Sequence, residues 1–251
     1  MSQTEKATQF AKLHIKGAPI LLYNAWDAGS AKSILAAGAK AIATSSWAVA
    51  AAQGYQDGED IPLSLVEQII ARITASIDAP VTADFEGGYS EDDGDLADNI
   101  SRLLDVGVIG INFEDRVVKG SGLYDIERQA RRIAAIRKAA EKHGTNLFIN
   151  ARTDVFFRPG DPAASVGEAL ERAVAYETAG ASGIFVPGLT ADALIGRLAD
   201  KVSLPLNVMV MEGVPSNARL AELGVSRISY GPIPYADASK NLQQEARKIF
   251  S

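Results

Sequence analysis

Cysteine is absent from this chain of 251 residues, and histidine occurs only twice, as His14 and His143. The lack of cysteine excludes disulfides, thiolate nucleophiles, cysteine-ligated zinc and iron–sulfur clusters. Both histidines lie in segments with a helical pattern, away from the strand ends identified below. A Ser-His-Asp triad and proton transfer by histidine are therefore not expected.

Clusters of basic residues and long apolar runs are missing as well. The net charge is -6, and the 25 Lys and Arg are spread thinly, which argues against nucleic acid or an anionic membrane surface as a partner. No apolar run approaches the roughly 18 to 20 residues of a membrane span. The polar N-terminus, MSQTEKATQFAKLHIKG, resembles neither a secretory signal nor a transit peptide. With 47% hydrophobic residues, we expect a soluble cytoplasmic protein with a substantial core.

What the chain does contain is a regular alternation of short apolar runs and longer helical patterns. Eight strand-like runs, each followed by a segment with apolar residues three and four apart, predict a (β/α)8 barrel. This barrel is expected to be a single domain over residues 1–251, with a leading helix in 1–18 and the last barrel helix in 236–250. The runs cover residues 19–27, 41–46, 80–86, 110–115, 147–154, 183–188, 204–210 and 227–232.

A doubly wound open sheet is the alternative to the barrel. Such a sheet normally carries a phosphate-binding fingerprint after its first strand, and the segment NAWDAGSAKS is not one. Neither GxGxxG nor GxxxxGK occurs in the chain, which disfavours the dinucleotide-binding and P-loop folds.

Polar side chains gather at the predicted strand ends, where barrels of this kind carry their chemistry. Asp84 and Glu86 share one face of their strand because strand side chains alternate, and Glu114 ends the next strand. Carboxylates this close repel one another unless a cation lies between them. Arg152 supplies a single charge, whereas a divalent metal suits several acids better. Ligation by oxygen alone favours magnesium or manganese over zinc.

Structural roles are the alternative for several of these residues. A single acid at a strand end can cap the following helix, and this structural role is the alternative for Asp27 and Asp115. Ser45 and Ser46 can be ordinary loop residues, and Arg152 can be a simple salt-bridge partner. Three acids that converge on one barrel mouth are costly, however, which favours a functional role for that set.

Several separated motifs resemble the isocitrate lyase/phosphoenolpyruvate mutase superfamily. They are LLYNAWDAGSA, TSSWAVAAAQGYQDGE, ADFEGGYS, GINFEDR and NARTDVF, and they occur in the superfamily's order and spacing over nearly the whole chain. The resemblance implies a (β/α)8 barrel, dependence on Mg2+ with Mn2+ as the substitute, and a small anionic α-oxo or α-hydroxy carboxylate as substrate. It also implies an enolate-like intermediate and a homo-oligomer, a dimer or tetramer, whose subunits exchange their final helix.

Roles for individual residues follow from the same resemblance. Asp84 matches the acid that contacts the metal directly, and Glu86 stands where many relatives have Asp. Glu114 matches the glutamate of the metal shell, and Asp57 the acid that reaches the metal through water. Arg152 matches the arginine that pairs with the substrate's carboxylate or phosphonate. The other candidate substrate-binding residues are Tyr23, Ser45, Ser46, Trp47, Asn150 and Asn207, of which the two serines are expected to act largely through backbone N–H groups.

The loop RVVKGSGLYDIE, residues 116–127, departs from the superfamily's pattern. Lyases carry a Lys-Cys-Gly-His type motif there, and phosphonomutases an asparagine, and this loop has neither. Lys119 and Ser121 are its polar candidates for catalysis. Gly120 and Gly122 suit a lid that opens and closes. The alternative is a flexible loop that has no role in catalysis.

The leading hypothesis is a magnesium-dependent lyase that cleaves a C–C bond of a small α-oxo or α-hydroxy acid through an enolate. Oxaloacetate decarboxylation or hydrolysis uses the same site. A second hypothesis is P–C chemistry, of the phosphoenolpyruvate mutase or phosphonopyruvate hydrolase type. A third, from another class, is a barrel that binds an oxo acid without turning it over.

Overall fold

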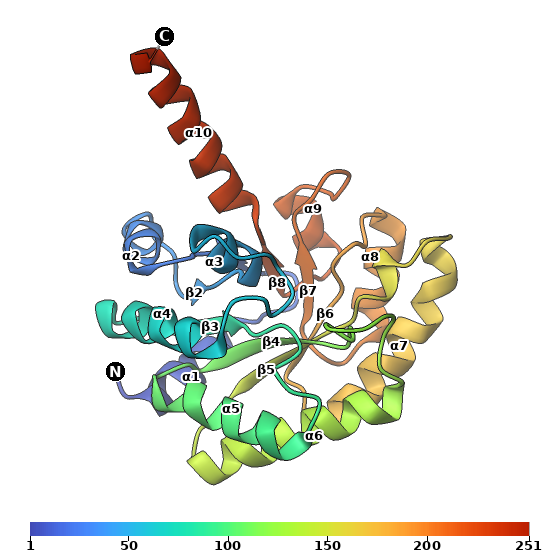
Figure 1. Cartoon of the computed structure of the whole chain (residues 1–251). Helices are drawn as coiled ribbons and strands as arrows, with labels where there is room; N and C mark the ends of the chain where they lie inside the picture. Colours follow the sequence, from blue (N-terminus) through green and yellow to red (C-terminus); the bar gives the residue numbers. More distant parts are fainter. Residues whose placement is uncertain (251) are drawn as a thin grey trace.

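Eight parallel strands form one sheet, nearly closed into a barrel, in the computed structural model, which describes residues 1–250 (Figure 1). The strand order is β1-β8-β7-β6-β5-β4-β3-β2, and an isolated parallel bridge between Ala25 and Thr44 joins the continuations of β1 and β2. Each predicted run contains one strand, so the predicted (β/α)8 barrel is confirmed. The strands are β1 Ile20–Leu22, β2 Ile42–Ala43, β3 Val81–Asp84, β4 Gly110–Glu114, β5 Phe148–Arg152, β6 Gly183–Phe185, β7 Leu206–Met209 and β8 Arg227–Ser229.

Helices follow the strands, and several of them begin at a side chain that caps the first turn. The side chains of Asp92, Asp125 and Asp161 accept N–H groups from the first turns of α5, α6 and α7. None of the helices within residues 1–250 combines the length and hydrophobicity that a membrane span needs. The helices are α1 Gln3–Lys12, α2 Ala28–Ala36, α3 Ser46–Ala52, α4 Leu63–Ser76, α5 Asp93–Asp105, α6 Ile126–His143, the 3-10 helix η1 Val155–Phe157, α7 Pro162–Thr178, α8 Asp192–Lys201, α9 Asn217–Glu222 and α10 Ile233–Phe250.

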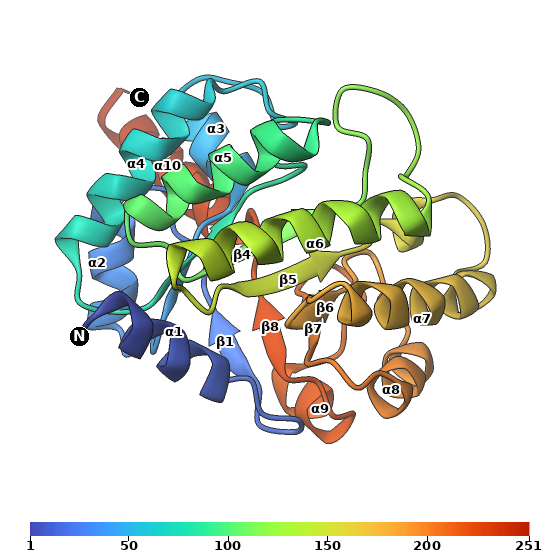
Figure 2. The same cartoon turned by 90° about the horizontal axis from the view of Figure 1, so that it is seen from below.

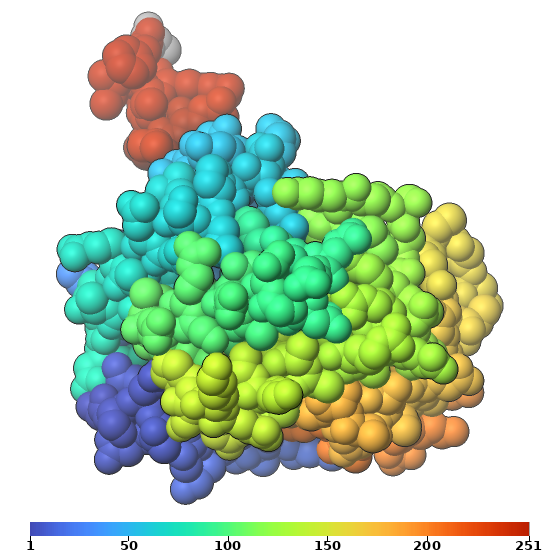
Figure 3. Space-filling view, turned by 60° about the horizontal axis from the view of Figure 1, so that its bottom comes forward, coloured from blue at the N-terminus to red at the C-terminus, as the bar shows by residue number. Residues whose placement is uncertain are grey.

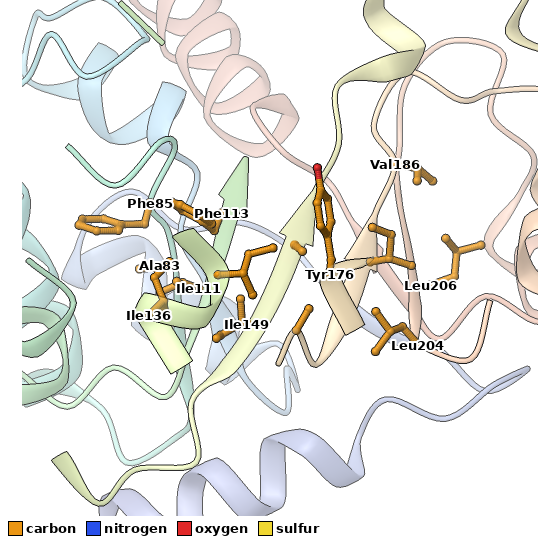
Figure 4. Packing of buried hydrophobic residues seen from close by; sticks show 14 of the residues in the cluster. Ala83, Phe85, Ile111, Phe113, Ile136, Ile149, Tyr176, Val186, Leu204 and Leu206 are labelled. Carbon is orange, nitrogen blue, oxygen red and sulfur yellow. The ribbon is translucent and has the colours of Figure 1, made fainter. Parts of the chain in front are cut away.

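The largest hydrophobic cluster lies between the outer face of the barrel and its helices. Ile111 of β4 and Ile149 of β5 are buried there with Ile136 of α6 (Figure 4). Burial of such side chains is worth about 1.5 to 3 kcal/mol each. The alternation of strand side chains therefore turns the other set, Asn112, Glu114 and their neighbours, toward the barrel interior.

Helix α1 packs at the end of the barrel where the strands begin, the end seen in Figure 2. Its Phe10 is fully buried, contacts Phe148 with ring centroids 5.4 Å apart, and belongs to a cluster that includes Ile109. The predicted leading helix is thus confirmed, although it ends at Lys12 rather than residue 18. With this end filled by side chains, the open end of the barrel is the one formed by the carboxyl ends of the strands.

Helix α10 does not cover its own barrel. It projects away from the body of the molecule (Figures 1 and 3), and Pro234 is its only buried residue within the described chain. The prediction of a helix over 236–250 is confirmed, but the prediction that it packs as the last barrel helix is wrong. An apolar groove of about 730 Å³, lined among others by Leu21 and Ile34, lies on the outer side of β1 and α2. Leu242 and Phe250 of α10 are correspondingly exposed.

Candidate active site at the carboxyl ends of the strands

Asp84, Ser46 and Asp57 form a connected group at the barrel mouth. Asp84 Oδ2 accepts hydrogen bonds from the Ser46 N–H and Oγ, at 3.0 and 2.9 Å. Ser46 Oγ also lies 3.4 Å from Asp57 Oδ1. One serine therefore lies between a carboxylate at the end of β3 and one from the loop after α3. The superfamily resemblance assigns both of these acids to the metal.

Arg152 lies between two other carboxylates. Its Nη1 is 3.0 Å from Glu114 Oε2, and its Nε and Nη2 donate to the two oxygens of Asp154 at 2.6 and 2.9 Å. Arg116 Nε donates to the second oxygen of Glu114 at 3.3 Å. Two of the five N–H groups of Arg152 are donated to Asp154, and the contact with Glu114 is an ion pair. Arg152 with its two acids carries no excess positive charge.

Negative charge at this mouth is therefore only partly compensated. Burial first, and then the charges of Asp57 and Asp84, raise the pKa of Glu86 to about 9. Burial raises the pKa of Glu114 to about 7, against the opposing charge of Arg152. Glu86 and Glu114 are 4% and 3% exposed, so water screens them little. Buried acids with raised pKa values are typical of a functional site that receives a cation.

The donor set fits Mg2+ in its chemistry. Within residues 1–250, no three His, Cys, Asp or Glu side chains are grouped so as to hold a metal ion by themselves. The reason is visible in the contacts, because Glu86 accepts the Glu59 N–H at 3.0 Å and Glu114 is paired with two arginines. Mg2+ needs only one or two carboxylates and keeps several waters, so Asp84 and Asp57 supply enough oxygen ligands.

A hydrogen-bonded layer of amides lies beneath the acids. Asn150 Nδ2 and Arg227 Nη2 both donate to Asn112 Oδ1 at 2.9 Å. Two donors on this oxygen fix the amide so that Asn112 Nδ2 faces Asp84 Oδ1, 3.3 Å away. The predicted substrate-binding residues Asn150 and Asn207 are 1% and 0% exposed within this interior. Asn150 thus supports Asn112 and, through it, Asp84, whereas Asn207 accepts the Ser229 hydroxyl at 3.3 Å.

The sequence model of the family described as phosphoenolpyruvate phosphomutase matches residues 10–250 of this chain. The chain belongs to this family. The match covers the barrel strands and every candidate site residue, and it confirms the superfamily resemblance read from the motifs.

Proteins similar to this chain carry different names, and one of them is uncharacterised. An uncharacterised protein of Mycobacterium tuberculosis is 34% identical over 240 residues, 96% of this chain and 88% of that protein. An oxaloacetate decarboxylase of Pseudomonas savastanoi is 30% identical over 190 residues, 72% of this chain and 62% of that enzyme. The crystal structure of a candidate phosphonomutase from Burkholderia cenocepacia is 45% identical, with a TM-score of 0.95, and covers 98% of this chain and 99% of that one. Membership of this family supports an enzyme.

Three of the residues predicted to bind substrate lie at the edge of the site or outside it. Tyr23 is 43% exposed and lines the outer apolar groove, because its neighbours along the chain, Leu22 and Asn24, take the buried positions. The Ser45 hydroxyl caps α3 by accepting the Ala48 N–H at 3.4 Å. Trp47 is 40% exposed and packs edge-on against a tyrosine in the first turn of α10. Of the two serines, only Ser46 contacts the acids.

The family's lid position is occupied by a short hairpin. Arg116 and Leu123 form an isolated antiparallel bridge, and the loop beyond it exposes Lys119 and Ser121. Lys119 lines a pocket of about 190 Å³ whose other residues include Glu59 and Arg116. The structure therefore places Lys119 at the rim of a pocket that Glu59 lines, a pocket whose lining does not include Asp84 or Glu114, while Ser121 stays at the exposed tip of the loop.

Sequence reasoning missed the network that supports Arg152. Asp115 is fully buried and accepts the Asp154 N–H at 3.0 Å, Arg172 Nη1 at 3.0 Å and the Tyr176 hydroxyl at 2.9 Å. The alternative role of Asp115 as a helix cap is therefore not observed, whereas Asp27 does cap α2. Arg172 and Tyr176 lie one turn apart on the buried face of α7, a polar pair that a sequence pattern can reveal.

Proposed function

We propose that the protein is a magnesium-dependent lyase that cleaves a C–C bond of a small α-oxo or α-hydroxy carboxylic acid through an enolate. The observation that carries this proposal is the set of buried acids with raised pKa values at the mouth, beside an Arg152 that is already paired. A cation is the missing partner of such a set, and an anionic substrate follows from the cation.

Asp84 and Asp57 would hold the metal, and the nearby charges of Glu114 and Glu86 would add to the attraction for it. A bound divalent ion supplies Lewis-acid stabilisation of the negative charge that develops on the substrate's oxygens. The charge of the ion also opposes the repulsion among the acids, which lowers their pKa values toward the ordinary range.

Arg152 orients the substrate in this proposal. A guanidinium is a planar fork of N–H groups that matches a carboxylate, and Asp154 keeps that of Arg152 fixed through two hydrogen bonds. A substrate held in this way presents its scissile bond in one orientation. Lys119 Nζ, at the rim, is the proton donor we propose for the carbon that receives the electron pair of the broken C–C bond. Closure of the 116–127 loop excludes water from that carbon.

The proposal is tested by measuring turnover of a panel of oxo and hydroxy dicarboxylic acids. Each acid is assayed in the presence of EDTA and again after Mg2+ or Mn2+ has been restored. We expect cleavage only with metal. Equal turnover after complete metal removal overturns the assignment. Identification of the products by chromatography distinguishes cleavage into two smaller acids from release of CO2, the decarboxylation of oxaloacetate named for one relative that is 30% identical.

P–C bond chemistry is the second candidate. It is favoured by the 45% identity to the candidate phosphonomutase over nearly the whole chain. The same metal and Arg152 would bind phosphonopyruvate. Phosphorus NMR of that compound with the Mg2+-loaded protein separates the two proposals, since a moved or released phosphorus signal supports this candidate and an unchanged spectrum excludes it.

We further propose that the protein is a homo-oligomer in which α10 of one subunit covers the apolar groove of another. The groove of about 730 Å³ and the exposed apolar side chains of α10 support this proposal. Apolar surface of this extent on one face is typical of an interaction site. The mass of the protein in solution, measured by light scattering, tests it, and a monomer at micromolar concentration contradicts it.

A further inference from the structure

Three residues other than glycine adopt left-handed backbone conformations within residues 1–250, and they lie together. They are Glu59, with φ of 58°, Glu86, with 48°, and Tyr89, with 61°. Glu59 belongs to the loop after α3, whereas Glu86 and Tyr89 belong to the loop after β3. Side chains with a Cβ rarely take this conformation, and it persists where the surrounding structure holds it.

Two reciprocal hydrogen bonds hold these residues. The N–H of Glu59 donates to Glu86 Oε2 at 3.0 Å, and the N–H of Tyr89 donates to Glu59 Oε1 at 2.8 Å. Each loop thus contributes a carboxylate to the other loop's strained backbone. We call Glu59, Glu86 and Tyr89 the carboxylate latch.

Gly87 shows that the two loops meet closely at the latch. A Cβ at Gly87 would lie 3.1 Å from Glu59 Oε1 and 2.8 Å from Val118 Cγ2. Glycine is therefore required for the Glu59 carboxylate to approach the loop after β3, with the lid loop on its other side.

The latch joins the loop that carries Asp57 to the loop that directly follows Asp84 at the end of β3. Asp57 precedes Glu59 by two residues, and Asp84 precedes Glu86 by two. Between Asp57 and Asp84 themselves, the connection runs through Ser46, whose contact with Asp57 is long at 3.4 Å. The latch hydrogen bonds are shorter, so they set how the two loops lie relative to each other.

We infer that Glu59 is a positioning residue, which holds the 54–60 loop through the latch so that Asp57 faces Asp84. Glu86 is then the acceptor that fixes this loop, rather than a carboxylate free to face the mouth. This inference rests on the proposed function only in assigning Asp57 to the metal.

Hydrogen exchange of individual backbone amides in the metal-free protein tests the latch directly. Glu86→Gln keeps an oxygen acceptor at the same reach, whereas Glu86→Asp withdraws it by one methylene. We expect the Glu59 amide to exchange about tenfold faster or more in Glu86→Asp and to stay protected in Glu86→Gln. Equal protection of this amide in the parent and both variants overturns the inference.

The second arm changes Glu59 itself. Glu59→Ala is expected to speed the exchange of the Tyr89 amide and to weaken Mn2+ binding by about tenfold. Glu59→Gln is expected to keep both the protection of this amide and the Mn2+ affinity. Electron paramagnetic resonance measures the Mn2+ binding. Glu91→Ala is the matched control, because Glu91 lines the same pocket outside the latch. Unchanged Tyr89 exchange and Mn2+ affinity in Glu59→Ala overturn the inference. The two hypotheses can fail separately. If the Tyr89 amide loses protection in Glu59→Ala but the parent protein turns over no substrate, the latch is supported and the proposed function is refuted.

Discussion

Arg152 Nη1 lies 3.0 Å from Glu114 Oε2, so the arginine expected to bind substrate is already neutralised by an acid of the site. Asp154 takes two N–H groups of the same guanidinium, so a planar group with five donors is needed to hold both acids and still bind a ligand. Arg152→Lys is therefore expected to lower kcat/KM by about 100-fold, roughly 3 kcal/mol of lost transition-state binding. Arg158→Lys, at an exposed ion pair, is the control. A normal kcat/KM in Arg152→Lys contradicts the role.

Asp84 accepts two hydrogen bonds from Ser46 and one from Asn112, which makes it the best-oriented acid of the mouth. Asp84→Ala is expected to abolish metal-dependent turnover and to weaken Mn2+ binding by at least about 100-fold. Calorimetric titration with Mn2+ measures the affinity. Asp78→Ala, at an exposed acid near the N-terminus, serves as control. Retained metal affinity in Asp84→Ala removes this residue from the site.

Arg227 is 1% exposed, and its Nε and Nη1 have no hydrogen-bond partner among residues 1–250. Burial lowers its pKa to about 9, which shows the cost of holding a cation there. Arg227→Met is therefore expected to keep the free energy of unfolding within about 1 kcal/mol or to raise it. Because Asn112 then loses a donor, metal affinity is expected to fall. A strongly destabilised variant, measured by urea unfolding, contradicts this expectation.

His14 stacks on Phe148 with ring centroids 4.0 Å apart, and burial, aided by the charge of Arg227, lowers its pKa to about 3. The unfolded chain binds a proton at this residue below about pH 6.5, and the folded chain does not. Stability is therefore lost as pH falls below about 6.5, by about 2 kcal/mol at pH 5. Urea unfolding at pH 7.5 and 5 measures the loss. It should shrink in His14→Gln and persist in His143→Gln.

Helix α10 leaves Leu242, Ile249 and Phe250 exposed at 71%, 80% and 87%. Removal of residues 238–250 is expected to convert the proposed homo-oligomer to monomers, since the groove of about 730 Å³ then loses its cover. Sedimentation velocity measures the change. Lys248→Ala, at a polar position of the same helix, should keep the assembly intact. An unchanged sedimentation coefficient after truncation refutes helix exchange.

The sequence by itself determined the barrel and the position of its chemistry. Alternation along each strand is a local property, so it places Asp84, Glu114 and Arg152 at the carboxyl ends without knowledge of any partner. The caps of the helices are equally local, and Asp27 is an example.

Tertiary structure alone decided which groups these residues meet. Arg227 reaches Asn112 across 115 positions, and Glu59 meets Glu86 across 27, distances over which no sequence period operates. The outward position of Tyr23 and the departure of α10 from the barrel depend in the same way on strand register and on packing between distant segments. Long-range hydrogen bonds and burial form only when the chain closes on itself, which is why the pairing of Arg152 and the latch of Glu59 required the folded molecule.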